Sequence, residues 1–136
     1  MFSIRLKVRY AETDQMGVVY YANYFVWMEV VRTEWFEQSC GLSYAELERQ
    51  GLFLPVIETS CNYRQPIYYP EEVRISVKPR LHRDLYLEFD YQFSVENEIR
   101  AMGFSRHVFL NKERKIQRID GTIKRLLNNA GLVYAS

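Results

Sequence analysis

The sequence predicts a single α+β domain in which a curved antiparallel sheet wraps around one long central helix. The chain has 136 residues, enough for one hydrophobic core but not for two. One alternating segment is followed by one long helical segment and then by four further segments with strand character. An antiparallel sheet has an apolar face that must be covered, and only the long helix can cover it.

The composition indicates a globular protein. Apolar residues make up 48% of the chain and charged residues 26%. The aromatic share of 15% favours strands or an aromatic-lined pocket. The net charge of +1 provides no overall field that would attract nucleic acid, so we expect no nucleic-acid partner.

The sequence also bears on the compartment. The charges at alternate positions from Arg5 to Arg9 exclude the apolar core of a signal peptide. We expect no membrane contact, because no window approaches the roughly 18 apolar residues that a spanning helix needs. Cys40 and Cys61 are too few for a disulfide framework and lack metal-ligand spacing, so we expect buried thiols in the cytoplasm and no metal site.

The first half of the chain predicts one strand and two helices. Residues 2–10 alternate apolar and polar side chains, as in a half-buried strand. Apolar residues spaced by three and four predict a helix over 21–39, whose wide apolar arc implies that other structure covers most of it. Ser43 and Glu46 have capping-box spacing, which opens a short helix ending near Gln50.

The second half predicts mainly strands. Segments 53–64, 72–80, 85–95 and 100–110 have strand character, and alternation is clearest in 85–95. Hairpin-length gaps after 80 and 95 predict that the last three strands form an antiparallel meander. Residues 121–128 predict a short closing helix, and we expect the tail, 129–136, to be frayed.

A loop just ahead of the long helix carries two carboxylates, Glu12 and Asp14. Asp14 lies about seven residues before the helix, too far to be its N-cap, and Gly17 supplies a tight turn between them. Free N–H groups at a helix start can polarise a substrate carbonyl while a nearby carboxylate attacks it or activates water. Spacing alone does not choose between Glu12 and Asp14.

Other polar residues are assigned structural roles. His82 and His107 lie on different strands without a third ligand at useful spacing. Ser60 and Ser105 lack the nucleophile elbow of serine hydrolases. Glu58 is unusual on an apolar strand, and we expect it to face a pocket or to pair with a basic neighbour.

Several basic side chains could bind the phosphates of a ligand: Arg80, Arg83, Arg118 and those of segment 112–115.

The loop and the start of the helix resemble the signature of hotdog-fold acyl-CoA thioesterases, in particular the 4-hydroxybenzoyl-CoA thioesterase branch. The similarity covers about residues 4–119, within one domain spanning 1–136. The residues that carry it are Tyr10-x-x-Thr13-Asp14-x-x-Gly17-Val18-Val19-Tyr20-Tyr21-Ala22-Asn23-Tyr24, then Trp27-Met28-Glu29 and Arg32-Thr33-Glu34.

The resemblance implies a hotdog fold with a five-stranded sheet, and roles for three loop residues. Asp14 would be the catalytic carboxylate, acting as nucleophile or as general base. The backbone N–H of Tyr21 would polarise the thioester carbonyl, and Gly17 would let the backbone approach the substrate. Many short-chain members have histidine where this chain has Tyr21, whereas the hydroxybenzoyl type has tyrosine there.

The resemblance further implies hydrolysis of a short-chain or aromatic acyl-CoA to free acid and coenzyme A. Tyr24 and Arg83 would bind substrate, and no cofactor would be needed because coenzyme A enters only with the substrate. Edge-paired dimers assembling into tetramers are expected, with active sites between protomers. A non-catalytic acyl-CoA-binding or sensing domain is the alternative, and a dehydratase is disfavoured because the loop has no histidine.

Overall fold

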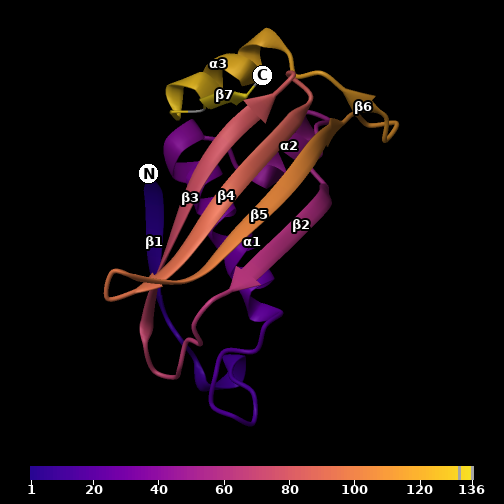
Figure 1. Ribbon diagram of the computed structural model, residues 1–136. Coiled ribbons are helices and arrows are strands. Elements are labelled where there is room, and N and C mark those ends of the chain that lie inside the picture. The colour runs from indigo at the N-terminus through magenta and orange to yellow at the C-terminus, as the bar shows by residue number, and fades with distance from the viewer. Residues whose placement is uncertain (132, 136) are drawn as a thin grey trace.

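A computed structural model describes residues 1–131 and 133–135 of the chain. Its main sheet has the strand order β1-β3-β4-β5-β2 (Figure 1). These strands are β1 (Phe2–Lys7), β2 (Val56–Tyr63), β3 (Glu72–His82), β4 (Tyr86–Val95) and β5 (Glu98–Leu110), and all pair antiparallel. The predicted α+β class, the five-stranded curved sheet and the meander of the last three strands are thereby confirmed.

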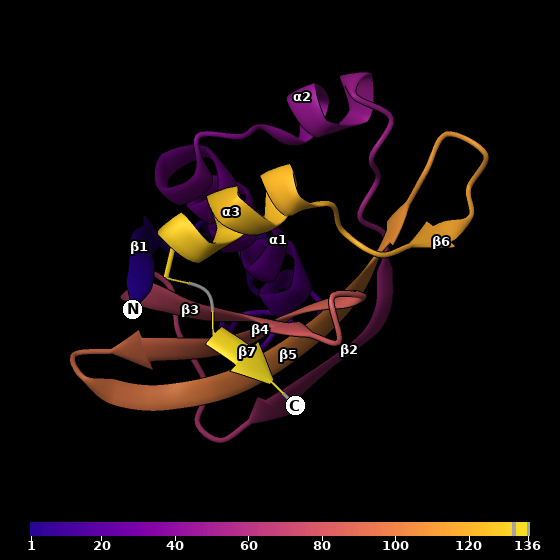
Figure 2. The ribbon, with the colours of Figure 1, turned by 90° about the horizontal axis from the view of Figure 1, so that it is seen from above.

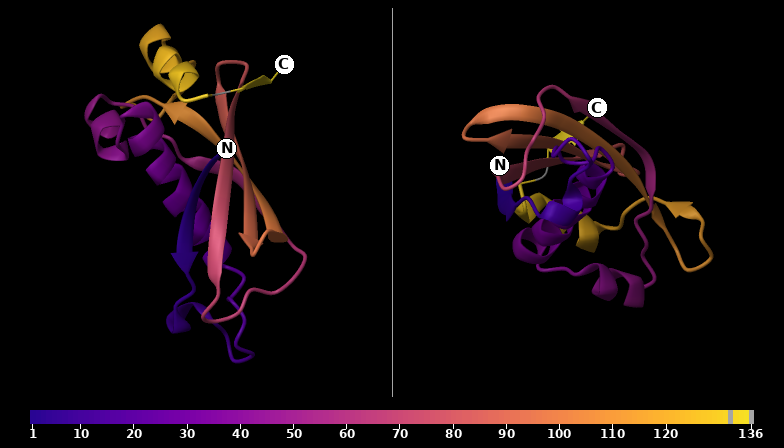
Figure 3. Two further views of the ribbon diagram at one scale, coloured as in Figure 1. Left: turned by 90° about the vertical axis from the view of Figure 1, so that its left-hand side faces the viewer. Right: turned by 90° about the horizontal axis from the view of Figure 1, so that it is seen from below.

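Three helices lie on one face of the sheet, and α1 fills its concave side (Figures 2 and 3). They are α1 (Asn23–Trp35), which continues into a π-helical turn (Phe36–Cys40), α2 (Tyr44–Arg49) and α3 (Gly121–Asn129). Ser43 caps α2 by accepting a hydrogen bond from the Glu46 N–H, as its spacing predicted. None of the helices in the described part of the chain is long and apolar enough to cross a membrane.

The core lies between α1 and the inner face of the sheet. Alternation places every second side chain of β3 and β4 on this face. The aromatic and aliphatic side chains of α1 pack against them, and burial of this apolar surface stabilises the fold. The largest fully buried members are Trp27, Trp35, Tyr91, Phe36, Phe89, Phe93, Phe109 and Met28.

Two expected boundaries differ in the structure. The first strand ends at Lys7 rather than near residue 10, because Tyr10–Glu12 forms a 3₁₀ turn in which the Glu12 N–H bonds to the Arg9 carbonyl. The central helix begins at Asn23, two residues after its expected start.

The expectation of a frayed tail is wrong for the residues described beyond α3. β7 (Val133–Ala135) pairs in parallel with β3, opposite Arg80–His82, beyond the part of β3 that pairs with β1. Residues 132 and 136 lie outside the described residues. A further short strand, β6 (Ile116–Gln117), pairs with the end of β5.

The outer face of the sheet carries a network of charges. Glu88 is buried between Arg80 and Arg106, with oxygen-to-nitrogen distances of 2.9 and 2.6 Å. Glu58 lies 3.7 Å from Arg106, so of its two expected roles it pairs with a basic neighbour. These ion pairs hold the outward side chains of β2, β3, β4 and β5 together.

Candidate active site

The loop that carries Asp14 is a small hairpin. The Asp14 N–H bonds to the Val18 carbonyl at 2.8 Å, and the Gly17 N–H bonds back to the Asp14 carbonyl at 3.0 Å. Gly17 has φ +76°, a left-handed conformation that other residues adopt only with strain. A Cβ at Gly17 would meet no atom within 4 Å, so the turn requires glycine for its backbone angle and not for space.

One carboxylate oxygen of Asp14 is held by this turn. Its Oδ1 accepts hydrogen bonds from the Met16 N–H at 2.8 Å and the Val18 N–H at 3.4 Å. Among the side chains of residues 1–131 and the described backbone, Oδ2 finds no hydrogen-bond donor and the carboxylate forms no ion pair. The half-buried side chain therefore has a fixed orientation and one oxygen available for chemistry.

Glu12, the other carboxylate of the loop, has a structural role. It is 8% exposed. Its oxygens accept hydrogen bonds from the Arg9 N–H at 2.8 Å and from the indole N–H of Trp27 at 2.9 Å. Burial alone would raise the pKa of Glu12, but these bonds and the Arg9 charge outweigh it and lower the pKa. Both oxygens are thus occupied.

The start of α1 presents unpaired backbone donors next to this loop. The Tyr20 N–H bonds to the Glu12 carbonyl at 2.8 Å, which ties the chain just before the helix to the loop. Within the described residues the N–H groups of Tyr21 and Ala22 donate no hydrogen bond. Free amides here carry the positive end of the helix dipole, so they suit an oxygen that develops negative charge.

A cavity of about 270 Å³ opens beside these donors. Tyr21 and Tyr24 line it together with Val18 and Val19. Asp14 does not line it, but its backbone N–H bonds to the carbonyl of the lining residue Val18. Its other wall comes from the end of β2 and the following loop, which the sequence did not suggest: Tyr63, Arg64, Gln65 and Pro66. Only the order of strands brings this segment to the helix start.

Aromatic contacts fix the floor of the cavity. The buried ring of Tyr24 packs edge-on against Tyr63 at 4.9 Å and against Phe93 at 5.2 Å between centroids. Burial raises the pKa of Tyr24 to about 12, so its hydroxyl remains protonated at neutral pH. Tyr24 is therefore both a core residue and a cavity wall.

Arg83 is separated from Asp14 by the length of the sheet in this chain. It lies in the turn after β3, whereas the Asp14 loop follows β1, whose last residue, Lys7, pairs with the first residue of β3, Glu72. In Figure 1 the two ends of β3 are at opposite ends of the molecule. Arg80 does not contribute to the site either, because its guanidinium forms ion pairs with Glu88 and Asp90 on the outer face of the sheet.

His107 occupies a structural position. Its Nε2 lies 3.0 Å from the Ser105 hydroxyl and its Nδ1 lies 3.3 Å from the Leu54 carbonyl. Burial, together with the Arg32 charge, lowers the pKa of His107 to about 4, so the imidazole is neutral in the fold. His82 stacks loosely on Tyr86 at 6.1 Å, far along the chain from the loop.

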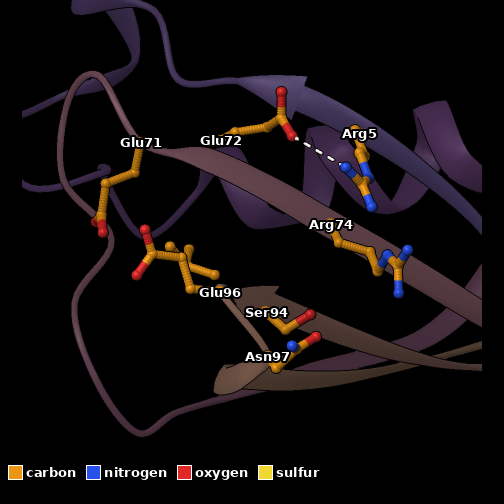
Figure 4. A pocket seen from close by; sticks show the side chains of 8 residues that line it. Arg5, Glu71, Glu72, Arg74, Ser94, Glu96 and Asn97 are labelled. Carbon is orange, nitrogen blue, oxygen red and sulfur yellow. Dashed lines mark ion pairs between the residues drawn. The ribbon is translucent and has the colours of Figure 1, made fainter.

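A second pocket, of about 370 Å³, lies between β1, β3 and the β4–β5 turn (Figure 4). Its lining is largely charged, with both signs present, and Arg5 and Glu72 form an ion pair across it at 3.5 Å. It contains no free helix N-terminus and none of the residues singled out in the loop. The cavity lined by Tyr21, Tyr24 and Tyr63, here called the tyrosine-lined cavity, is therefore the better candidate for catalysis.

The family model described as "Thioesterase-like superfamily" matches residues 8–127. The chain belongs to the thioesterase-like superfamily. This match includes the Asp14 loop, α1 and strands β2 to β6. The predicted family and the predicted class, thioester hydrolase, are confirmed.

Relatives and solved structures agree with this assignment. A Bacillus subtilis protein named "Putative acyl-CoA thioesterase YneP" is 35% identical over 109 residues, covering 79% of this chain and 78% of that protein. The structure of the hypothetical protein TT1821 from Thermus thermophilus is 36% identical, with TM-score 0.86 over 93% of this chain and 96% of that one. The DHNA-CoA thioesterase of Staphylococcus aureus is 31% identical, with TM-score 0.81 over 98% and 97%.

Proposed function

We propose that this chain is an acyl-CoA thioesterase that uses Asp14 and the amides at the start of α1 to hydrolyse a short-chain or aromatic acyl-CoA. Water adds across the bond between the carbonyl carbon and sulfur, which gives the free acid and coenzyme A. One observation carries the proposal: a carboxylate with one free oxygen lies in a hairpin that is bonded to a helix start with unpaired N–H groups.

Two chemical contributions support this mechanism. Asp14 Oδ2 either attacks the carbonyl carbon or removes a proton from the attacking water, and general base catalysis typically contributes about 10²–10⁴-fold. The Tyr21 N–H faces the oxygen that becomes negative in the transition state, a contribution of roughly 3–4 kcal/mol for one such donor. A thioester is already electrophilic and its thiolate leaves readily, so the reaction needs no metal or cofactor.

The lining of the cavity favours an aromatic acyl group among the two classes. Three tyrosine rings surround a space of about 270 Å³, and aromatic side chains suit flat apolar ligands. Proteins of Prochlorococcus marinus and Synechococcus that are 27% and 25% identical to this chain are named 1,4-dihydroxy-2-naphthoyl-CoA hydrolases. An aromatic acyl-CoA is therefore the first substrate to test.

A second copy of the chain would complete the site. β2 is an edge strand with an open outer edge in the described structure, and its side chains Val56, Ile57 and Tyr63 are 42%, 51% and 44% exposed. Open edges invite pairing with another strand. We propose an edge-paired dimer, further assembled into a tetramer, and analytical ultracentrifugation of the native chain and of Ile57→Asp tests this arrangement.

Antiparallel pairing of two β2 strands would place opposite ends of the two protomers side by side. The Arg83 side chain of one protomer would then approach the cavity of the other protomer. In that position its guanidinium can hold the phosphates of coenzyme A.

The free thiols of Cys40 and Cys61 are compatible with the reducing cytoplasm, which we propose as the location.

The test is a panel of acyl-CoA substrates in which the released thiol is measured for the native chain, Asp14→Asn and Asp90→Asn. Asp90 lies on the outer face of the sheet, paired with Arg80, and serves as the matched control. We expect turnover of at least one aromatic or short-chain substrate, a loss of kcat of at least 100-fold in Asp14→Asn and little change in Asp90→Asn. Equal turnover in native and Asp14→Asn would refute the mechanism, and binding without turnover would favour a non-catalytic acyl-CoA-binding domain.

A further inference from the structure

The side chain of Tyr63 ties the edge strand to the start of α1. Tyr63 is the last residue of β2, and its hydroxyl donates a hydrogen bond of 2.9 Å to the carbonyl oxygen of Tyr21. The two residues are 42 positions apart in the chain. Both line the tyrosine-lined cavity. This bond therefore connects β2 to the peptide unit that carries the unpaired Ala22 N–H.

Both peptide units with unpaired amides have an occupied carbonyl. The carbonyl of Tyr21 shares its peptide plane with the Ala22 N–H and accepts the bond from Tyr63. The carbonyl of Tyr20 shares its plane with the Tyr21 N–H and accepts a bond of 2.9 Å from the Asn23 N–H. Because a peptide unit is planar, fixing its oxygen also fixes the direction of its N–H. A hydrogen bond to the carbonyl also polarises the amide and strengthens it as a donor.

The ring of Tyr63 is held so that its hydroxyl can make this contact. It packs edge-on against the buried ring of Tyr24, with 4.9 Å between centroids, and Tyr24 packs in turn on Phe93. Partial burial raises the pKa of Tyr63 above its usual value, so the hydroxyl retains its proton at neutral pH. Tyr63 is thus a donor under the conditions in which a thioesterase operates.

We propose that Tyr63 is a positioning residue: its hydroxyl fixes the peptide unit between Tyr21 and Ala22 and thereby aims the Ala22 N–H at the thioester carbonyl oxygen, beside the Tyr21 N–H. This inference rests on the proposed function. The bond matters most when negative charge develops on the carbonyl oxygen, because the amide N–H groups then stabilise that charge. Loss of the hydroxyl should therefore reduce kcat more than it changes KM.

The first experiment compares Tyr63→Phe with Tyr68→Phe. Phenylalanine retains the ring that packs on Tyr24 and removes only the hydroxyl. Tyr68 is an exposed tyrosine in the same region, and its hydroxyl makes no hydrogen bond within the described residues, so it is the matched control. We expect kcat to fall roughly 3- to 10-fold in Tyr63→Phe, the range of one neutral hydrogen bond. The KM of Tyr63→Phe should change less than twofold. The kcat of the control, Tyr68→Phe, should also change less than twofold.

The second experiment distinguishes aiming of the amides from general support of the fold. A ketone analogue of the best substrate, in which CH₂ replaces the sulfur, is bound to the native chain and to Tyr63→Phe. The infrared stretching frequency of its carbonyl is then recorded. We expect the native chain to lower this frequency and Tyr63→Phe to lower it less, because the Ala22 N–H is then less well directed.

The outcomes separate the two proposals. An unchanged kcat or an unchanged carbonyl frequency in Tyr63→Phe, in a native chain that does hydrolyse acyl-CoA, would overturn the role of Tyr63 and leave the proposed function intact. A lower melting temperature with an unchanged frequency would mean that Tyr63 only supports the fold. A native chain that hydrolyses no thioester would refute both proposals.

Discussion

Glu12→Gln separates the two carboxylates of the loop more directly than any other substitution. The Glu12 carboxylate accepts one hydrogen bond from the Arg9 N–H and one from the Trp27 indole, and the Arg9 guanidinium lies 3.5 Å away. Glutamine keeps the size of the side chain but has one acceptor oxygen and one NH₂ group. One of the two donors would therefore face another donor in a site that is only 8% exposed.

The cost follows from these contacts. Hydrogen bonds to a charged group contribute about 1.5–3 kcal/mol, so losing one predicts a fall of about 2 kcal/mol in the free energy of unfolding at pH 7. For a domain of this size that corresponds to a melting temperature lower by about 7 °C. Because the pKa of Glu12 is lowered in the fold, its stabilisation is present above the unfolded pKa and is lost as pH falls through the folded value.

The assay is thermal unfolding of the native chain and Glu12→Gln from pH 7 to pH 3, with Glu37→Gln as control. Glu37 is exposed and forms no ion pair among the described residues. We expect the difference in stability between native and Glu12→Gln to shrink as pH falls below about 4.5, and kcat at 25 °C to fall less than tenfold. Unchanged stability with abolished hydrolysis would refute this reasoning and make Glu12 the catalytic carboxylate.

Two other substitutions give separate tests. Gly17→Ala should cost about 1–2 kcal/mol of stability, because alanine is strained at φ +76° although nothing crowds its Cβ; a chemical denaturation curve indistinguishable from the native one would contradict the role of the turn. His107 has a pKa of about 4 in the fold and about 6.5 when unfolded, so the native chain should lose up to about 3 kcal/mol between pH 6.5 and pH 4. His107→Gln should flatten that dependence in urea titrations, and an equally steep dependence in the variant would assign it to other groups.

The sequence by itself determined most elements, because apolar periodicity reflects which faces of a segment are buried. The spacing of Met28, Val31 and Trp35 predicts the buried face of α1, and the alternation along 85–95 predicts the buried face of β4. The Ser43 cap depends on side chains only three residues apart and was predicted for the same reason. The loop with Glu12, Asp14 and Gly17 was also singled out from the sequence, although spacing did not rank its two carboxylates.

Tertiary structure decided what depends on contacts between distant segments. It distinguishes Glu12 from Asp14, because the indole that occupies Glu12 comes from α1, 15 residues away. It places Tyr63 beside Tyr21, and it shows that Arg83 lies far from the Asp14 loop of the same chain. It also pairs β7 with β3, where the sequence suggested only a frayed tail. Periodicity reports local conformation and burial, whereas the order of strands depends on which distant surfaces pack together, and that order decides which residues meet at the cavity.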